Sequence, residues 1–150
     1  SKHLGEINLK NTNSIILRTN FFGHSVSNKK SFSDDVIKKA TNKEKIFLFN
    51  DVFFNPLRMD TICKILKLIL ESKNTITGLY NLGSNNGFSK GEFIRKILKL
   101  KKIKCTLVDS SLFEFFDNRS NNMLMDVSKF EKKFKIKLPD LDREIEDEFC

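Results

Sequence analysis

The sequence predicts an α/β fold, on three observations. Short apolar runs bounded by turn residues alternate with longer stretches in which apolar residues recur at helical spacing. None of the predicted strands is joined to the next by a β-hairpin turn. The clearest run, Ile15-Ile16-Leu17, is unbroken, which is typical of a parallel strand covered on both faces. The polar residues Arg18-Thr19-Asn20 follow it, at the end of the strand where open α/β sheets bind ligands.

Composition favours one folded domain. The chain has 150 residues, 39% of them hydrophobic and 15 of them Phe, which is enough for an ordinary core. Lys64 and Lys67 interrupt the longest helix-like apolar stretch, residues 62–70, so we expect no membrane partner. The polar start does not resemble a signal peptide. The three cysteines form no Cys-x-x-Cys pair and have no His partner at ligand spacing, so we expect a reducing cytoplasm and no zinc site.

The formal charge of +8 raises the question of a nucleic-acid partner. The lysines are spread over nearly every segment instead of forming one stripe, and the chain is equally rich in Asn, Ile and Phe but has a single Ala, Ala40. Because the favoured residues share AT-rich codons, codon bias explains much of the excess. We therefore expect no nucleic-acid partner, and at most a modest attraction to anionic small substrates.

The opening segment predicts the end of a helix, a linker and a strand. Lys2 and Glu6 are four residues apart, which places them on one helix face. The strand covers residues 15–20 and ends in a turn closed by Gly23. Arg18 is expected to pair with an acid inside the fold, for which Glu6 is a candidate.

The next segment predicts a helix, a strand and a turn. Residues 31–41 form the helix, with Ser33 as N-cap and two acids in the first turn. Residues 46–49 form a short strand, Asp51 is a candidate loop cap, and residues 53–56 form a turn that ends in Pro.

The middle of the chain repeats this alternation. Apolar spacing predicts a helix over residues 58–71, and two glycines bound a strand over residues 78–83. A turn follows at residues 84–87. Ser89 and Glu92 then have the spacing of a capping box that opens another helix.

The last third predicts one strand and three helices. The strand covers residues 105–108, and residues 109–111 cap a short helix over residues 112–116. Phe130 and Phe134 lie four apart in a helix over residues 127–134. An acidic amphipathic helix then runs from about residue 140 to 149.

Several short motifs resemble those of the extended short-chain dehydrogenases, and in particular the dTDP-4-dehydrorhamnose reductase family. They occur in the family's order and span nearly the whole chain. The matching residues are Ser1-Lys2 with Gly5-Glu6, Leu17-Arg18-Thr19, Phe49-Asn50-Asp51 with Pro56, Gly78-Leu79-Tyr80-Asn81-Leu82-Gly83, Ser89-Lys90 with Glu92-Phe93, Arg119 with Asn122, Asp126, Ser128 and Lys129, and Leu138-Pro139-Asp140. The chain departs from the family at Ser120, where Pro is usual, and at Leu57, where Thr is usual.

The resemblance implies the last strands of a Rossmann-like parallel sheet plus the small C-terminal substrate-binding lobe of a longer reductase. Approximately residues 1–30 and 58–84 would belong to the Rossmann side, and residues 31–57 and 85–150 to the lobe. The glycine-rich cofactor loop and the catalytic Tyr would precede residue 1, so we expect this chain alone to be inactive. The missing amino-terminal part or a partner chain, including a second copy in a homodimer, would cover the open strand edges.

The resemblance also implies site residues and cofactors. Lys2 falls on the Lys of the family's Tyr-x-x-x-Lys motif, where its ammonium lowers the Tyr pKa and binds the ribose of NADPH or NADH. Phe21 would lie beside the cofactor. Asn20, Arg119 and Asn122 would bind the nucleotide sugar, since Arg suits diphosphates and Asn suits hydroxyls. The sequence shows no convincing metal ligands, and the resemblance leaves a Mg²⁺ requirement open.

The implied reaction is reduction of the 4-keto group of a dTDP-linked deoxyhexulose in deoxysugar biosynthesis. A nucleotide-sugar epimerase or dehydratase of the same superfamily, or a non-catalytic regulatory subunit with this fold, are the alternatives. Each site residue also has a plain structural alternative: Lys2 as a solvated lysine, Arg119 as a surface ion pair and Asn20 as a turn residue. The residue four positions before Lys2 separates catalysis from binding, because only Tyr supports catalysis.

Overall fold

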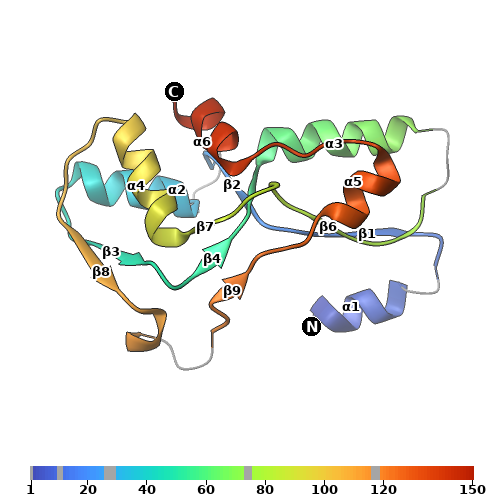
Figure 1. The fold of residues 1–150 in the computed structure, drawn as a ribbon, viewed down its shortest axis with the longest axis horizontal. Coiled ribbons are helices and arrows are strands. Elements are labelled where there is room, and N and C mark those ends of the chain that lie inside the picture. Colours follow the sequence, from blue (N-terminus) through green and yellow to red (C-terminus); the bar gives the residue numbers. More distant parts are fainter. Residues whose placement is uncertain (1, 10–11, 26–29, 73–75, 116–118) are drawn as a thin grey trace.

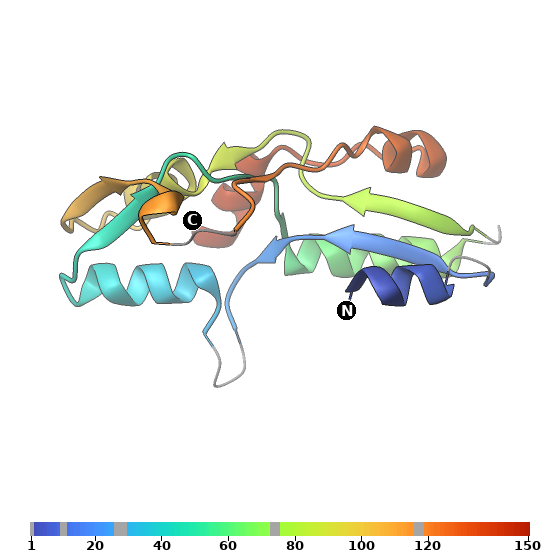
Figure 2. The same ribbon diagram turned by 90° about the horizontal axis from the view of Figure 1, so that it is seen from below.

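The computed structural model describes residues 2–9, 12–25, 30–72, 76–115 and 119–150. It confirms the predicted α/β fold: helices pack on pairs of parallel strands (Figure 1). Figure 2 shows an elongated molecule with two lobes, joined at short strands near its middle. We call them the β1–β6 lobe and the β3–β8 lobe.

The β1–β6 lobe contains the predicted parallel strands. β1 (Ile15–Thr19) pairs with β6 (Gly78–Leu82), so that Leu17 lies opposite Tyr80. α3 (Met59–Glu71) and α5 (Ser128–Phe134) cover one face through Ile62, Ile65 and Phe130, which share a core with these strands. α1 (Lys2–Leu9) lies against the other face.

The aliphatic run of β1 is less buried than its unbroken pattern predicts. Ile15, Ile16 and Leu17 are only half-buried. A cavity of about 270 Å³ separates α1 from the strands, with Ile7, Ile16 and Leu79 in its wall. Incomplete cover on this face accounts for the partial burial of Ile16, which lines the cavity.

The β3–β8 lobe is a second helix-covered pair. β3 (Ile46–Phe49) runs parallel to β8 (Leu107–Ser110). α2 (Phe32–Thr41) and α4 (Lys90–Leu100) pack against it, and their apolar stripes form a core with the strands. That core consists of Val36, Ala40, Ile46, Leu48, Ile94 and Leu98.

Two small sheets and α6 (Leu141–Phe149) connect the lobes. β2 (Phe21–Phe22) pairs with β5 (Leu57–Arg58), and β4 (Phe53–Phe54) lies between β7 (Phe88–Ser89) and β9 (Asn122–Met123). A largely aromatic core lies beneath them: Phe22, Phe54, Phe93, Ile97, Leu141, Ile145 and Phe149.

Of the two N-caps predicted from the sequence, that of α4 is confirmed and that of α2 is not. The predicted box at the start of α4 is present, since Glu92 N donates to Ser89 Oγ at 3.1 Å and Ser89 N donates to Glu92 Oε2. The prediction that Ser33 caps α2 was wrong. Ser31 is the N-cap, because Asp34 stands three residues after it and completes a capping box. Ser33 instead is buried and donates to Gly23 O at 3.2 Å.

Three short elements differ from the predictions. Phe53 and Phe54, predicted as a turn, form the central strand β4, because β7 and β9 supply backbone partners on both sides. The strand predicted at residues 105–108 is displaced by two residues to β8. The short helix predicted over residues 112–116 is a single 3₁₀ turn, η1 (Leu112–Glu114), capped by Ser111, and residue 116 lies outside the described residues.

Residues 127–138 pack in the β1–β6 lobe. Their range was expected in the substrate-binding lobe, but Val127, Phe130 and Leu138 share the core of the β1–β6 lobe. The Phe130 ring stacks on Phe134 at 4.4 Å and meets Tyr80 of β6 edge-on. The chain therefore returns to the first lobe before α6.

Candidate functional site

The candidate site lies where β1 ends, between the two lobes. In both ribbon views α1 begins near the end of β1, and β2, β4 and β9 lie around the same region (Figures 1 and 2). The carboxyl end of a parallel strand pair is the usual ligand-binding edge of an open α/β sheet. The sequence-predicted site residues come from these elements.

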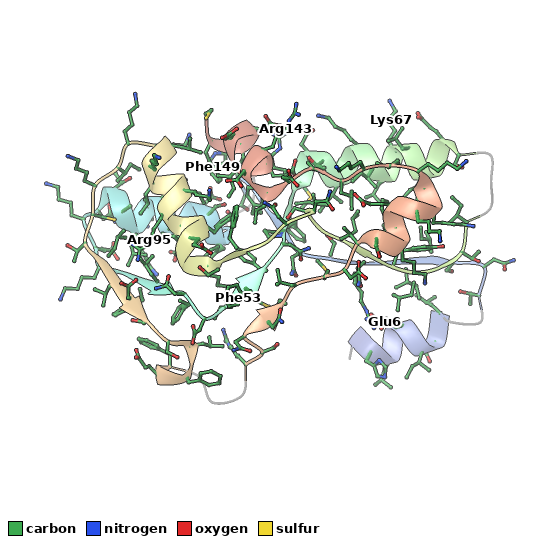
Figure 3. The ribbon with its side chains drawn as sticks, in the orientation of Figure 1. Glu6, Phe53, Lys67, Arg95, Arg143 and Phe149 are labelled. Atoms are coloured by element: carbon green, nitrogen blue, oxygen red, sulfur yellow. The ribbon has the colours of Figure 1, made fainter. Side chains whose placement is uncertain are left out.

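Lys2 is the first residue of α1, and its side chain lies outside the described part of the structure. The helix that carries it is fixed to β1 by a forked ion pair, as predicted. Arg18 Nε and Nη2 donate to the two carboxylate oxygens of Glu6 at 2.7 and 2.6 Å. Hydrogen bonding from Arg18 lowers the pKa of Glu6 below its ordinary value. Figure 3 shows Glu6 on the side of α1 that faces the strands.

Asn20 and Phe21 continue from the end of β1. Asn20 is half-buried, and its carbonyl oxygen accepts a hydrogen bond from Leu57 N at 3.0 Å, which ties this turn to β5. The Phe21 ring is 60% exposed, whereas Phe22 is buried, as expected for alternation along a strand. Phe21 therefore presents an apolar ring at the carboxyl end of β1.

Asn122 and Arg119 come from the β9 side of the small sheets that connect the lobes. Asn122 is an exposed residue of β9 whose Oδ1 accepts a hydrogen bond from Leu124 N at 3.1 Å. Arg119 is exposed and precedes β9. Lys90 at the start of α4 has a pKa below its ordinary value. Burial is the main cause, and the positive charge of Arg119 adds to it.

One stretch of backbone joins these residues. We call residues 53–58 the central segment. Phe53 pairs with Asn122, and Leu57 pairs with Phe21. Leu57 lies four residues after Phe53, at most about 14 Å along the backbone, so β2 and β9 pair with opposite ends of this short segment. The structure thus links Phe21 and Asn122 through the central segment, with Asn20 next to Phe21 in the chain.

The buried amide of Asn55 holds the central segment in place. Its Nδ2 donates to the carbonyl oxygens of Ser84 and Met125, both at 2.9 Å, and its Oδ1 accepts from Met125 N at 2.9 Å. Leaving such a buried group unpaired is costly, so these bonds specify one position for the segment. Asn55 was not singled out from the sequence, in which it appears as an ordinary turn residue.

The C-terminal helix fixes the other side of the site. Glu144, 2% exposed, accepts hydrogen bonds from Arg58 N at 2.6 Å and Thr61 Oγ1 at 2.8 Å. Glu148 accepts one from His24 N at 3.0 Å. Gly23 makes this approach possible, because its φ of 137° suits only Gly and an added Cβ would lie 3.0 Å from Glu148 Oε1.

An aromatic hollow of about 250 Å³ lies between α2 and β3. Its rings are those of Phe32, Phe47, Phe49 and Phe115. Lys39 and Lys45 also line it, and Lys39 is paired with Asp35 at 2.8 Å. This hollow was not predicted from the sequence, although the alternation of Phe47 and Phe49 along one strand was a usable signal.

The described residues contain neither a metal-binding cluster nor a membrane-spanning helix. Within that part of the chain, no group of three or more His, Cys, Asp or Glu side chains could hold a metal ion. Nor is any helix there both long enough and apolar enough to span a bilayer. His24, predicted not to be a ligand, places Nδ1 2.8 Å from Asp34 Oδ1.

The family model described as the RmlD substrate binding domain matches residues 1–149. The chain belongs to this family. The match extends over almost every residue, and so includes the turn after β1 and the stretch from Arg119 to Lys129. No curated protein sequence matches the chain.

Solved structures of nucleotide-sugar enzymes have the same fold as this RmlD-family chain. dTDP-4-dehydrorhamnose reductase of Bacillus anthracis, in complex with NADP, is 22% identical with a TM-score of 0.76, over 90% of this chain and 47% of that one. The Clostridium acetobutylicum reductase is 17% identical with a TM-score of 0.73, over 89% and 47%. UDP-glucuronic acid 4-epimerase of Bacillus cereus, with UDP-glucuronic acid and NAD, is 19% identical with a TM-score of 0.70, over 99% and 48%.

The chain therefore spans about half the length of these relatives. The predicted resemblance is confirmed, and so is the expectation of a Rossmann-type α/β fold. Of these relatives, the Bacillus anthracis reductase contains NADP and the Bacillus cereus epimerase contains NAD.

Proposed function

We propose that this chain forms the substrate-binding part of a nucleotide-sugar reductase that reduces the 4-keto group of a dTDP-linked deoxyhexulose with NADPH or NADH. The observation that carries this proposal is the central segment, which pairs with Phe21 at Leu57 and with Asn122 at Phe53 and so links the turn after β1 to β9. Residues contributed from both ends of such a segment suit a substrate with a sugar at one end and a nucleotide at the other.

The residues present fit a nicotinamide dinucleotide at the end of β1. Phe21 offers an exposed apolar ring there. Lys2 is the first residue of α1, which begins near the end of β1 (Figure 1). The dinucleotide, when bound, supplies the hydride for carbonyl reduction. Lys2 would hold the ribose hydroxyls and stabilise the phenolate of a Tyr one helical turn earlier, which makes that Tyr a better proton donor to the carbonyl oxygen.

The substrate residues divide by chemistry. Asn20 and Asn122 carry amides that both donate to and accept from sugar hydroxyls. Arg119 carries the charge and paired donors that suit a diphosphate. We propose the β1–β6 lobe, residues 1–30 and 58–84, as the Rossmann side, with residues 31–57 and most of 85–150 as the substrate side and α5 returning to the first.

Substitution of Lys2 tests this proposal in the protein expressed from its full reading frame. Lys2→Met should lower turnover of the 4-keto nucleotide sugar about a hundredfold or more, because the proton donor loses its neighbouring charge. Binding of the sugar nucleotide should persist. The control is Lys64→Met, an exposed lysine on α3 that pairs only with Asp60 among the described residues. Normal turnover in Lys2→Met would dismiss the assignment.

An epimerase is the second candidate, because the Bacillus cereus UDP-glucuronic acid 4-epimerase matches 99% of this chain with a TM-score of 0.70. Product analysis separates the two. A reductase consumes one NADPH or NADH for each sugar, whereas an epimerase returns its dinucleotide unchanged. A protein that binds the sugar nucleotide but forms no product would instead be a non-catalytic subunit.

A further inference from the structure

The turns that precede β3 and β8 lie side by side at the free end of the β3–β8 lobe. The two strands run parallel, and Ile46 N donates to Thr106 O at 3.0 Å, so both strands begin at the same end. In Figures 1 and 2 this end lies away from the small sheets that connect the lobes. Exposed lysines come from these two turns and from the last turn of α4, and we call them the basic end: Lys43, Lys45, Lys99, Lys102 and Lys104.

The charge of the basic end is not neutralised within the described part of the chain, where no carboxylate forms an ion pair with these lysines. Two nearby acids pair with other cations. Asp35 pairs with Lys39 at 2.8 Å, and Asp109 pairs with Arg95 at 2.6 Å. Glu44 is exposed in the turn before β3 and offsets a single charge. The basic end therefore keeps a net positive charge.

A groove of about 590 Å³ lies beside the basic end, lined by residues of α4, of β8 and of the loop between them. Its apolar lining consists of Leu98, Ile103, Cys105 and Leu107. Arg95 and the last three lysines of the basic end also line it. This combination suits a segment that carries both apolar and acidic side chains.

The outer edge of β8 is open next to this groove. Among the described residues, β3 is the one strand that pairs with β8. Because Ile46 N donates to Thr106 O, the backbone N–H and C=O groups of Leu107 and Asp109 face away from β3. An unpaired strand edge can accept a strand from another chain. Since Leu107 also lines the groove, a strand added at this edge would run along it.

We propose that the basic end and the open edge of β8 bind an extended, acidic segment of a partner protein. The segment adds to β8 as a strand, its carboxylates contact Lys99, Lys102 and Lys104, and its apolar side chains enter the groove. A second copy of this chain fits less well, because each copy would bring the same lysines to the contact. A nucleic acid or an anionic membrane would leave the strand edge and the apolar lining unused. This inference does not depend on the proposed function.

Fluorescence anisotropy with the full-length protein tests the proposal, using a labelled peptide of about eight residues in which Val and Glu alternate. Lys102 and Lys135 are a matched pair, because both follow a helix, with φ of 53° and 54°, in a conformation that Gly adopts readily. Lys102→Gly should weaken peptide binding about threefold without lowering the melting temperature. Lys135→Gly, in the β1–β6 lobe, should leave peptide binding unchanged.

Two further measurements separate strand addition from charge attraction alone. Joint replacement of Lys99, Lys102 and Lys104 by Gln should weaken the peptide about tenfold or more. Amide exchange at Leu107 and Asp109 should slow when the peptide is bound, because their N–H groups gain acceptors. A peptide in which Val and Lys alternate should not bind.

Peptide affinity that neither Lys102→Gly nor the triple substitution changes would overturn the proposal. Unaltered exchange at Leu107 and Asp109 would also overturn it, because the peptide would then be held by charge without joining the sheet. Tighter binding of single-stranded DNA or of phosphatidylserine vesicles through the same lysines would assign the basic end to a nucleic acid or a membrane instead.

Discussion

The Asp51 side chain connects the loop before β4 to the start of η1. It was a candidate loop cap from the sequence, and the structure shows its carboxylate bound to Ser111 Oγ and Leu112 N. The hydrogen bond from Ser111 is the largest cause of a lowered Asp51 pKa, and the bond from Leu112 N adds to it, while burial opposes both. The cap is therefore strongest when Asp51 is ionised.

The stability contributed by Asp51 should depend on pH in a defined direction. A carboxyl group whose pKa is lower in the folded than in the unfolded state stabilises the protein above its ordinary pKa of about 4. That contribution is lost as the pH falls through the folded-state pKa. Asp51→Asn should therefore melt at a lower temperature than the unsubstituted protein near neutral pH, and the difference should shrink in acid.

Thermal melting across that pH range measures the effect. Asp147→Asn, which removes an exposed carboxylate on α6, serves as the control and should leave the acid dependence unchanged. A difference between Asp51→Asn and the unsubstituted protein that is constant with pH would contradict the capping role.

At the scale of elements, α6 positions the turn after β1 through its carboxylates. Glu144 binds Arg58 N and Thr61, and Glu148 binds His24 N beyond Gly23. Arg58 Nη1 in turn donates to the carbonyl oxygen of Asp147 at 2.5 Å. The acidic pattern of this helix was visible in the sequence, but its partners were not, because they lie more than eighty residues away.

Removal of the buried carboxylate should loosen this connection. Glu144→Ala leaves Arg58 N and the Thr61 hydroxyl without their acceptor, at a cost of about 2–4 kcal/mol of unfolding free energy. Urea denaturation measures it. Glu146→Ala, at an exposed position of the same helix, should change stability by less than about 0.5 kcal/mol. Equal effects of the two substitutions would show that the Glu144 contacts do not stabilise the fold.

For the molecule as a whole, the sequence predicted those elements well whose position depends on one local rule, such as helix capping or helical spacing. The capping box at Ser89 and the helix that carries Phe130 and Phe134 four residues apart were predicted from residue type and spacing. Glu6 was the predicted candidate partner of Arg18, and the ion pair is present.

The N-cap of α2 was predicted wrongly although a local rule decides it, because Asp34 stands three residues after Ser31 and completes a capping box, whereas Val36 stands three residues after Ser33. Tertiary packing then buries Ser33 against Gly23.

The candidate site was harder to predict because it is assembled across the lobes. Asn20, Phe21 and Asn122 came from the family resemblance, and only the two-residue strands on the central segment bring them together. Strands that short carry no periodic signal. The aromatic hollow was missed for a related reason, since Phe115 in its lining comes from a distant part of the chain.

The central claim is that a nucleotide sugar binds where the two lobes meet along the central segment. Amide hydrogen exchange of the full-length protein, with and without dTDP, measures this most directly. We predict slower exchange over residues 20–24 and 119–125, with no change in α3 on the outer side of the β1–β6 lobe. Protection confined to α3, or exchange in residues 20–24 and 119–125 that dTDP leaves unaltered, would contradict the claim.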